Sequence, residues 1–263
     1  MATWLHRWDA TADRRAIFLR CYALMTCNVL DSLDSGRFSD PEGALRLLER
    51  FSDYYFATIE LIPFVGTLPP AWQAAHRLAA DPNASACEVL LLGLNAHVNN
   101  DVPQALADRL AADWPTSPSR LEAIRADFWN IVGVIADSLD AAQQQMATRA
   151  DRLLACIDVE MRPLARPAVR SMRDVITAWR EGIWEDALTL LTAGDLHWRA
   201  AIRDDIEHAA WKRAHLLVCD IDQRDRLVAL GTHELHQVFP PHGPGSACRI
   251  GASTCDSWAP SVA

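Results

Sequence analysis

Hydrophobic residues recur at helical spacing along most of this chain. Residues 13–33 carry apolar side chains three and four positions apart, and Gly36 provides a stop. A second helix is predicted from Pro41 to about Glu60, because Asp40 is a favourable cap and proline suits the first helical position. The same periodicity predicts helices over residues 72–80, 85–101, 104–114, 119–136 and 138–161, two helices within 169–193 that break near Gly182, and one or two within 196–230.

No strand-like alternation of useful length occurs, so we predict an all-α, multi-helix bundle. A chain of 263 residues forms one large domain or two small ones. We predict a single helical domain over residues 1–239. Residues 240–263 are rich in proline, glycine and serine and lack periodicity, so we predict a flexible, disordered tail there.

Charge and composition exclude several kinds of partner. The net charge of −9 argues against a nucleic-acid partner, which needs a basic surface, and against anionic membranes. No uninterrupted apolar run reaches the roughly 18 residues that a membrane span needs, and the N-terminus lacks the apolar core of a signal peptide. We therefore expect a cytoplasmic protein without a membrane partner. Its seven cysteines, which form no CxxC pair, are expected to be free thiols.

The polar residues between Leu94 and Pro103 are the chain's most distinctive feature. An apolar run gives way there to Asn95, His97, Asn99, Asn100 and Asp101. Because proline disfavours a helical residue before it, we expect the helix to end or kink just after Asp101. His97 and Asp101 are four apart and share one helical face. Alternatively, Asp101 or Asn100 caps the helix that follows.

Residues 95–103, with the sequence NAHVNNDVP, resemble the signature of an uncharacterised bacterial family, a domain of unknown function marked by N-A-H-[IV]-N-x-D-[LV]-P. Weaker similarities to that family are Asp13, Arg14, Phe18, Tyr22, Met25, Thr26, Phe38, Ser39, Asp40, Phe51, Tyr54, Tyr55, Phe56 and Trp72. The resemblance covers about residues 10–135. It implies a helical fold and no known activity, substrate or cofactor.

Two interpretations of the motif stay open. Its polar side chains hydrogen-bond the backbone at a helix junction, or they form a functional pocket. For the pocket we predict a small-molecule enzyme, of isomerase, cyclase or hydrolase type, that needs no cofactor. His97 is then the general acid or base and Asp101 orients it. The predicted substrate-binding residues are Asn95, Asn99, Tyr22, Tyr54 and Trp72.

Two alternative functions remain. In the first, His97 and Asp101 bind a divalent metal in a hydrolase, and a catalytic zinc site then needs at least one more ligand. The residues considered for that role are His76, His208, His215, Asp31 and Asp34. In the second, the chain is a non-catalytic helical module that binds a ligand or partner. The sequence does not predict the oligomeric state.

Overall fold

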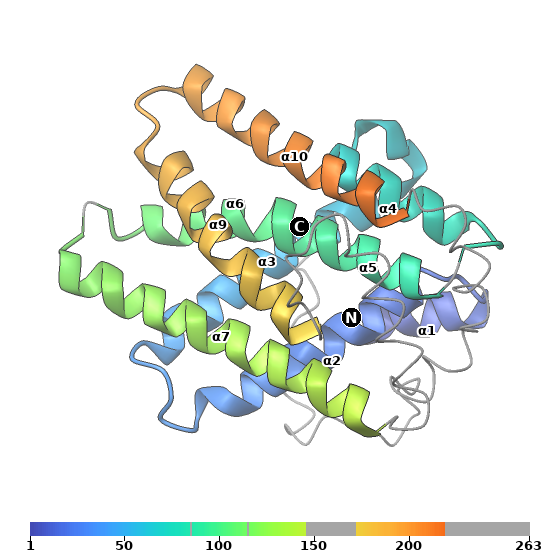
Figure 1. Cartoon of the computed structure of the whole chain (residues 1–263), viewed down its shortest axis with the longest axis horizontal. Coiled ribbons are helices and arrows are strands. Elements are labelled where there is room, and N and C mark those ends of the chain that lie inside the picture. The colour runs from blue at the N-terminus through green and yellow to red at the C-terminus, as the bar shows by residue number, and fades with distance from the viewer. Residues whose placement is uncertain (85, 115, 146–171, 219–263) are drawn as a thin grey trace.

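The structure is a computed structural model that describes residues 1–84, 86–114, 116–145 and 172–218 (Figure 1). Every regular element in these ranges is a helix, which confirms the predicted all-α bundle. The α-helices are α1 (Ala2–Ala10), α2 (Ala16–Leu33), α3 (Pro41–Glu60), α4 (Pro70–Ala80), α5 (Ala86–Ala96), α6 (Val102–Ala111), α7 (Pro118–Gln145), α9 (Met172–Thr192) and α10 (Leu196–Val218). A 3₁₀ segment, η1 (Ile62–Thr67), precedes α4, and a π-helical turn, η2 (His97–Asp101), joins α5 to α6. The predicted tail over 240–263 and the predicted helical residues 146–161 and 219–230 lie outside the described residues.

The start of α3 follows from its sequence. The Asp40 carboxylate accepts a hydrogen bond from the backbone N–H of Gly43 at 2.8 Å, and Pro41 occupies the first turn, as predicted. The loop before α3 is held by α7, because the buried carboxylate of Asp127 accepts from the N–H groups of Ser39 and Asp40, each at 2.8 Å. These contacts fix where α3 enters the bundle.

Three helix boundaries differ from the prediction. Helix α1 was not expected, because residues 2–10 were too short a window to show a clear period. Helix α7 runs unbroken through the predicted gap at Asp137. The Ser138 hydroxyl donates to the Val134 carbonyl at 2.6 Å, so this polar side chain is satisfied inside the helix. Helix α9 runs unbroken through Gly182, because a glycine inside a helix costs only about 1 kcal/mol.

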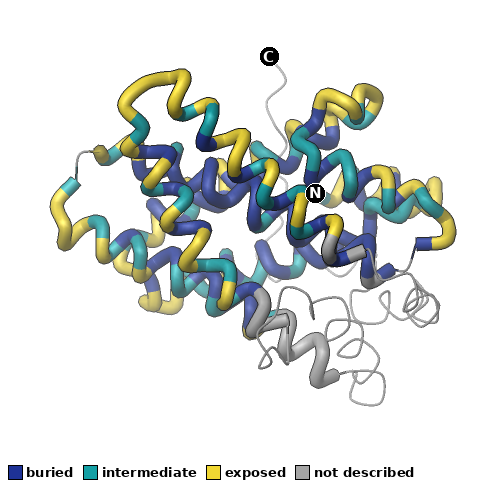
Figure 2. The backbone as a smooth tube through the Cα atoms, turned by 45° about the horizontal axis from the view of Figure 1, so that its top comes forward, coloured by how far each residue is buried: buried dark blue, intermediate teal, exposed yellow. Residues whose placement is uncertain are grey.

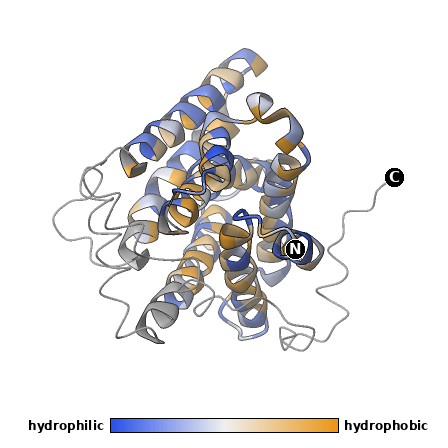
Figure 3. Cartoon of the chain, turned by 90° about the vertical axis from the view of Figure 1, so that its right-hand side faces the viewer, coloured by the Kyte–Doolittle hydropathy of each residue, from blue (hydrophilic) through white to orange (hydrophobic). Residues whose placement is uncertain are grey.

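Helices α5 and α6 follow each other through the middle of the bundle (Figure 1), where much of the backbone tube is coloured as buried (Figure 2). Helix α4 packs against α5 and α10, α6 packs against α3 and α9, and α7 packs against α2 and α9. Leu91, Leu94 and Ala96 of α5 are each at most 1% exposed. Figure 3 shows hydrophobic and hydrophilic residues alternating around most helices, as expected for helices with one buried side. The polar motif therefore lies in the centre of the protein.

Two findings concern features that the sequence analysis used for the compartment, an apolar helix and the state of the cysteines. Helix α2 is long and apolar enough, by length and composition, to cross a membrane, although 61% of it is buried in the bundle. A core helix and a signal sequence share this composition, so the finding does not assign a location. Cys21 is a buried free thiol, as expected, whereas Cys27 is disulfide-bonded, which corrects the expectation of a free thiol there.

Candidate functional site

The motif forms a π-helical turn rather than a helix end. The N–H of Val102 donates to the His97 carbonyl five residues back, and Val102 itself has helical φ and ψ angles of −60° and −43°. The prediction that the helix ends after Asp101 is therefore wrong, and the irregularity expected there takes the form of a π turn. Pro103 has no N–H, and its ring clashes with the carbonyl four residues back in a regular helix. The extra residue in the π turn displaces that carbonyl and lets the helix continue.

Asp101 is the centre of the site's hydrogen bonds. Its carboxylate accepts from the indole N–H of Trp72, which lies 3.0 Å from both oxygens, and from the Asn100 side-chain amide at 2.8 Å. The His97 Nδ1 lies 3.0 Å from Oδ2 of the same carboxylate. Asp101 does not cap α6 with its side chain, so the capping alternative is wrong for this residue. A fully buried carboxylate is thus held by three donors.

The bond to Asp101 sets the form of His97. Since the carboxylate can only accept, His97 donates its Nδ1–H, and the neutral ring then has a bare lone pair on Nε2. Burial lowers the pKa of His97, while the hydrogen bond and the charge of Asp101 oppose that shift. The ring is 1% exposed, and its Nε2 has no hydrogen-bond partner among the described residues. His97 is therefore a buried neutral acceptor with an unused nitrogen.

Aromatic rings surround His97. Phe51 stacks on its face with ring centroids 3.6 Å apart and an interplanar angle of 10°, and the Tyr22 ring lies edge-on at 4.3 Å. Phe18, Tyr55 and Trp72 lie within 5.5 to 6.2 Å. Phe18, Phe51 and Tyr55 were not predicted as site residues. The sequence spacing could have predicted them. Phe18 lies four residues before Tyr22, and Phe51 lies four residues before Tyr55, so each pair shares one helical face.

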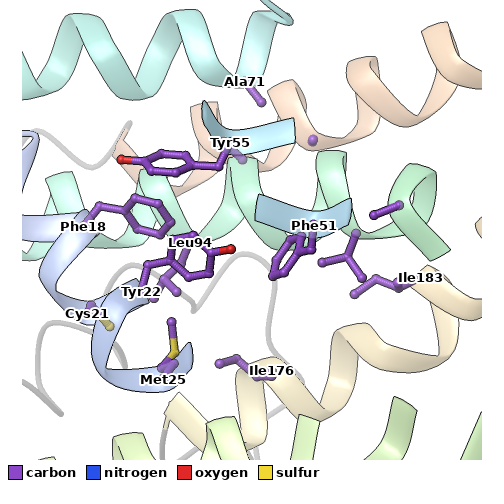
Figure 4. Packing of buried hydrophobic residues seen from close by; sticks show 14 of the residues in the cluster. Phe18, Cys21, Tyr22, Met25, Phe51, Tyr55, Ala71, Leu94, Ile176 and Ile183 are labelled. Carbon is purple, nitrogen blue, oxygen red and sulfur yellow. The ribbon is translucent and has the colours of Figure 1, made fainter. Parts of the chain in front are cut away.

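An apolar cavity lies beside His97. Its volume is about 50 Å³. Figure 4 shows Tyr22 and Met25 of α2, Phe51 of α3 and Ile176 of α9 gathered around this part of the core. The His97 ring forms part of the cavity wall. The site thus combines one unused nitrogen with an apolar space.

The predicted tyrosines separate into two places. Tyr22 lines the cavity, and its hydroxyl lies 2.7 Å from the Ser52 hydroxyl. Burial raises the pKa of Tyr22. Tyr54 is not among the described residues of the cavity wall: its hydroxyl donates to Asp108 at 2.8 Å, beside Arg50, and burial together with Asp108 raises its pKa to about 12. The structure therefore places Tyr22 at the site and Tyr54 away from it.

The two predicted asparagines join helices. The Asn99 side chain donates to the Asn95 side-chain oxygen at 3.1 Å, and the Asn95 amide donates to the Ala210 carbonyl of α10 at 2.8 Å. Neither asparagine is among the described residues of the cavity wall. Both are buried, so their bonds satisfy polar groups that α10 covers. One side of the motif is a helix junction, and the other side faces the cavity.

The alternative metal site lacks its ligands in the described part of the chain. No group of three His, Cys, Asp or Glu side chains gathers there in a way that could hold a metal ion. His97 and Asp101 bond directly to each other, and none of His76, His208, His215, Asp31 and Asp34 completes a site with them. These residues do not fit the donor set of a catalytic zinc.

Comparison with known proteins gives one match. Residues 1–219 match the model of a family described as "Family of unknown function (DUF5995)". No curated protein and no solved structure matches the chain. The expectation of an uncharacterised helical family is confirmed, while the function has to be inferred from the site.

Proposed function

Because the chain belongs to a family of unknown function, DUF5995, we propose from its site that it is a small-molecule enzyme with His97 as general base. One observation carries the proposal. A buried Asp101–His97 pair leaves Nε2 of His97 without a partner among the described residues, on a ring that lines an apolar cavity. An unpartnered buried polar atom is costly, and such atoms gather at functional sites.

The arrangement supports proton transfer in a definite order. A substrate in the cavity loses a proton to Nε2, and the electron pair of the broken bond stays on the substrate. The imidazolium that forms is stabilised by Asp101, which keeps its Nδ1–H oriented. Returning the proton to a different atom of the substrate completes an isomerisation. Trp72 and Asn100 hold the carboxylate in place, so both are positioning residues.

A test of proton transfer is possible before the substrate is identified. The purified chain is incubated in D₂O with a deproteinised cell extract, and mass spectrometry records compounds that gain deuterium or change in amount. His97→Gln removes the base. His76→Gln is a matched control, since His76 is also buried with an unpartnered Nε2 but is not among the described residues of the cavity wall. We expect changed compounds with the wild type and His76→Gln and none with His97→Gln. The same compounds changing with all three proteins would contradict the proposal.

A second candidate, a non-catalytic binding module, is favoured by one observation. Among the described residues of the cavity wall, the polar side chains besides His97 are Tyr22 and Thr26. The Tyr22 hydroxyl is hydrogen-bonded to Ser52, and the Thr26 hydroxyl is hydrogen-bonded to the Tyr22 carbonyl. These residues therefore provide no unused hydrogen-bond donor that could stabilise a negative charge developing on a substrate. Binding of a small molecule without any chemical change would favour this second function.

A further inference from the structure

The side chains of the cavity wall limit which kinds of ligand can bind. Its described residues include no lysine, arginine, aspartate or glutamate. The Thr26 hydroxyl donates to the Tyr22 carbonyl at 2.8 Å, and the Tyr22 hydroxyl is engaged with Ser52. The remaining polar side chain among the described residues of the wall is His97, whose Nε2 has no hydrogen-bond partner among the described residues. Among the described residues of the wall, a ligand therefore meets one imidazole with an unused nitrogen and otherwise apolar or already bonded side chains.

That one atom is an acceptor. His97 donates its Nδ1–H to Asp101, so a neutral ring offers only a lone pair at Nε2. The hydrogen of a bond at Nε2 has to come from the ligand. A hydroxyl supplies it, whereas an ether or a ketone does not.

The same surroundings disfavour a charged ligand. A carboxylate would enter a cavity whose described wall has no cation, close to Asp101 on the other side of the His97 ring. An ammonium group could donate to Nε2, but the Asp101 oxygens already accept from three donors, and Asp101 is not among the described residues of the cavity wall. Burying a charge without a direct counter-ion is costly.

The size of the cavity limits the ligand further. The cavity volume of about 50 Å³ is a few times the smallest space that holds a water molecule, about 10 to 15 Å³. The aromatic rings of Phe51 and Tyr22 pack against His97 and narrow the space around it. A group of about four or five non-hydrogen atoms therefore fits beside the imidazole.

We propose that the site takes a small, uncharged alcohol whose hydroxyl donates to Nε2 of His97 and whose apolar part lies against Met25 and Phe51. This inference rests on the proposed function and names its ligand class. It also predicts which of several molecules of similar size binds.

The test compares four probes in the full chain. They are 1-butanol, methyl propyl ether with the same number of non-hydrogen atoms, butanoate and butylammonium. Binding is followed by NMR of ¹³C-methyl-labelled methionine, with the Met25 signal, which lies in the cavity wall, assigned through Met25→Leu. One hydrogen bond predicts that 1-butanol binds about 3- to 10-fold more tightly than the ether. His97→Gln, which moves the acceptor, is expected to remove the preference.

The outcomes separate the inference from the proposed function. Preference for 1-butanol over the other three probes supports the inference, even if His97→Gln fails to fold. Equal binding of butanol and ether overturns the inference but leaves a ligand-binding cavity. Tighter binding of butanoate or butylammonium overturns the claim that the ligand is uncharged. If no probe shifts the Met25 signal, both the inference and the proposed function are refuted.

Discussion

Replacing Trp72 with phenylalanine tests how Asp101 is held. The substitution keeps an aromatic ring between Phe18 and His76, which the indole contacts at centroid distances of 5.8 and 5.4 Å. It removes the N–H that lies 3.0 Å from both oxygens of Asp101. A hydrogen bond to a charged group contributes about 1.5 to 3 kcal/mol to stability. The smaller ring also leaves a void, which costs about 1 kcal/mol.

The expected loss for Trp72→Phe is about 3 kcal/mol in the free energy of unfolding. In a domain of this size that corresponds to a decrease in Tm of about 6 to 12 °C. The measurement is thermal and urea unfolding followed by circular dichroism. Trp184→Phe is the matched control, because Trp184 is 5% exposed and packs against Phe128, yet its indole donates no hydrogen bond to a described residue.

For Trp184→Phe we expect only the loss caused by the void, about 1 kcal/mol in the free energy of unfolding, which corresponds to a decrease in Tm of roughly 2 to 4 °C. Equal decreases for the two variants would refute the reasoning, since the hydrogen bonds to Asp101 would then contribute nothing. The wild-type value is the common reference for both.

The packing and the buried groups lead to three further predictions. Gly93→Ala should destabilise the protein by about 1 to 2 kcal/mol in urea unfolding, because a Cβ there would lie 2.6 Å from the Phe18 ring. Gly182→Ala, which has open space around the added Cβ, should instead stabilise the protein by up to about 1 kcal/mol. Equal effects of the two variants would contradict the described packing around Gly93. Burial lowers the pKa of His76 from 6.5 to about 4. Between these pH values the unfolded chain binds a proton at His76 and the folded protein does not. The free energy of unfolding should therefore fall by about 3 kcal/mol from pH 7 to pH 4. In urea unfolding, His76→Gln should lose about 3 kcal/mol less than the wild type over the same pH range. A pH profile equal to that of the wild type would contradict this prediction. Asp101→Asn should destabilise by about 3 kcal/mol in urea unfolding, since an amide cannot accept from three donors without turning its own N–H groups toward one of them; wild-type stability would contradict it.

Local signals in the sequence predicted the helices well. The period of residues 13–33 and the pair Asp40–Pro41 fix α2 and the start of α3, because caps and periodicity act within a few residues. The same local reasoning failed at Pro103. A proline normally disturbs the helix before it, but one extra residue in the π turn removes the clash, and no short pattern in the sequence marks that turn.

The site was only partly predictable for a geometric reason. His97, Asp101 and Trp72 come together as the motif and the connector suggested, and Tyr22 lies against His97. Tyr54 and Tyr55 are adjacent, so they point about 100° apart on α3, and only the orientation of that helix decides which one faces His97. In the structure it is Tyr55.

The central claim is that His97 is neutral, donates its Nδ1–H to Asp101 and offers its Nε2 lone pair to the cavity. The most direct measurement is a long-range ¹H–¹⁵N correlation spectrum of the ¹⁵N-histidine-labelled chain at pH 7, with His97→Gln used to assign the signals. The account predicts a proton on Nδ1, none on Nε2, and an Nε2 shift that moves when 1-butanol is added. A proton on Nε2, or an Nε2 signal that no cavity ligand changes, would contradict it.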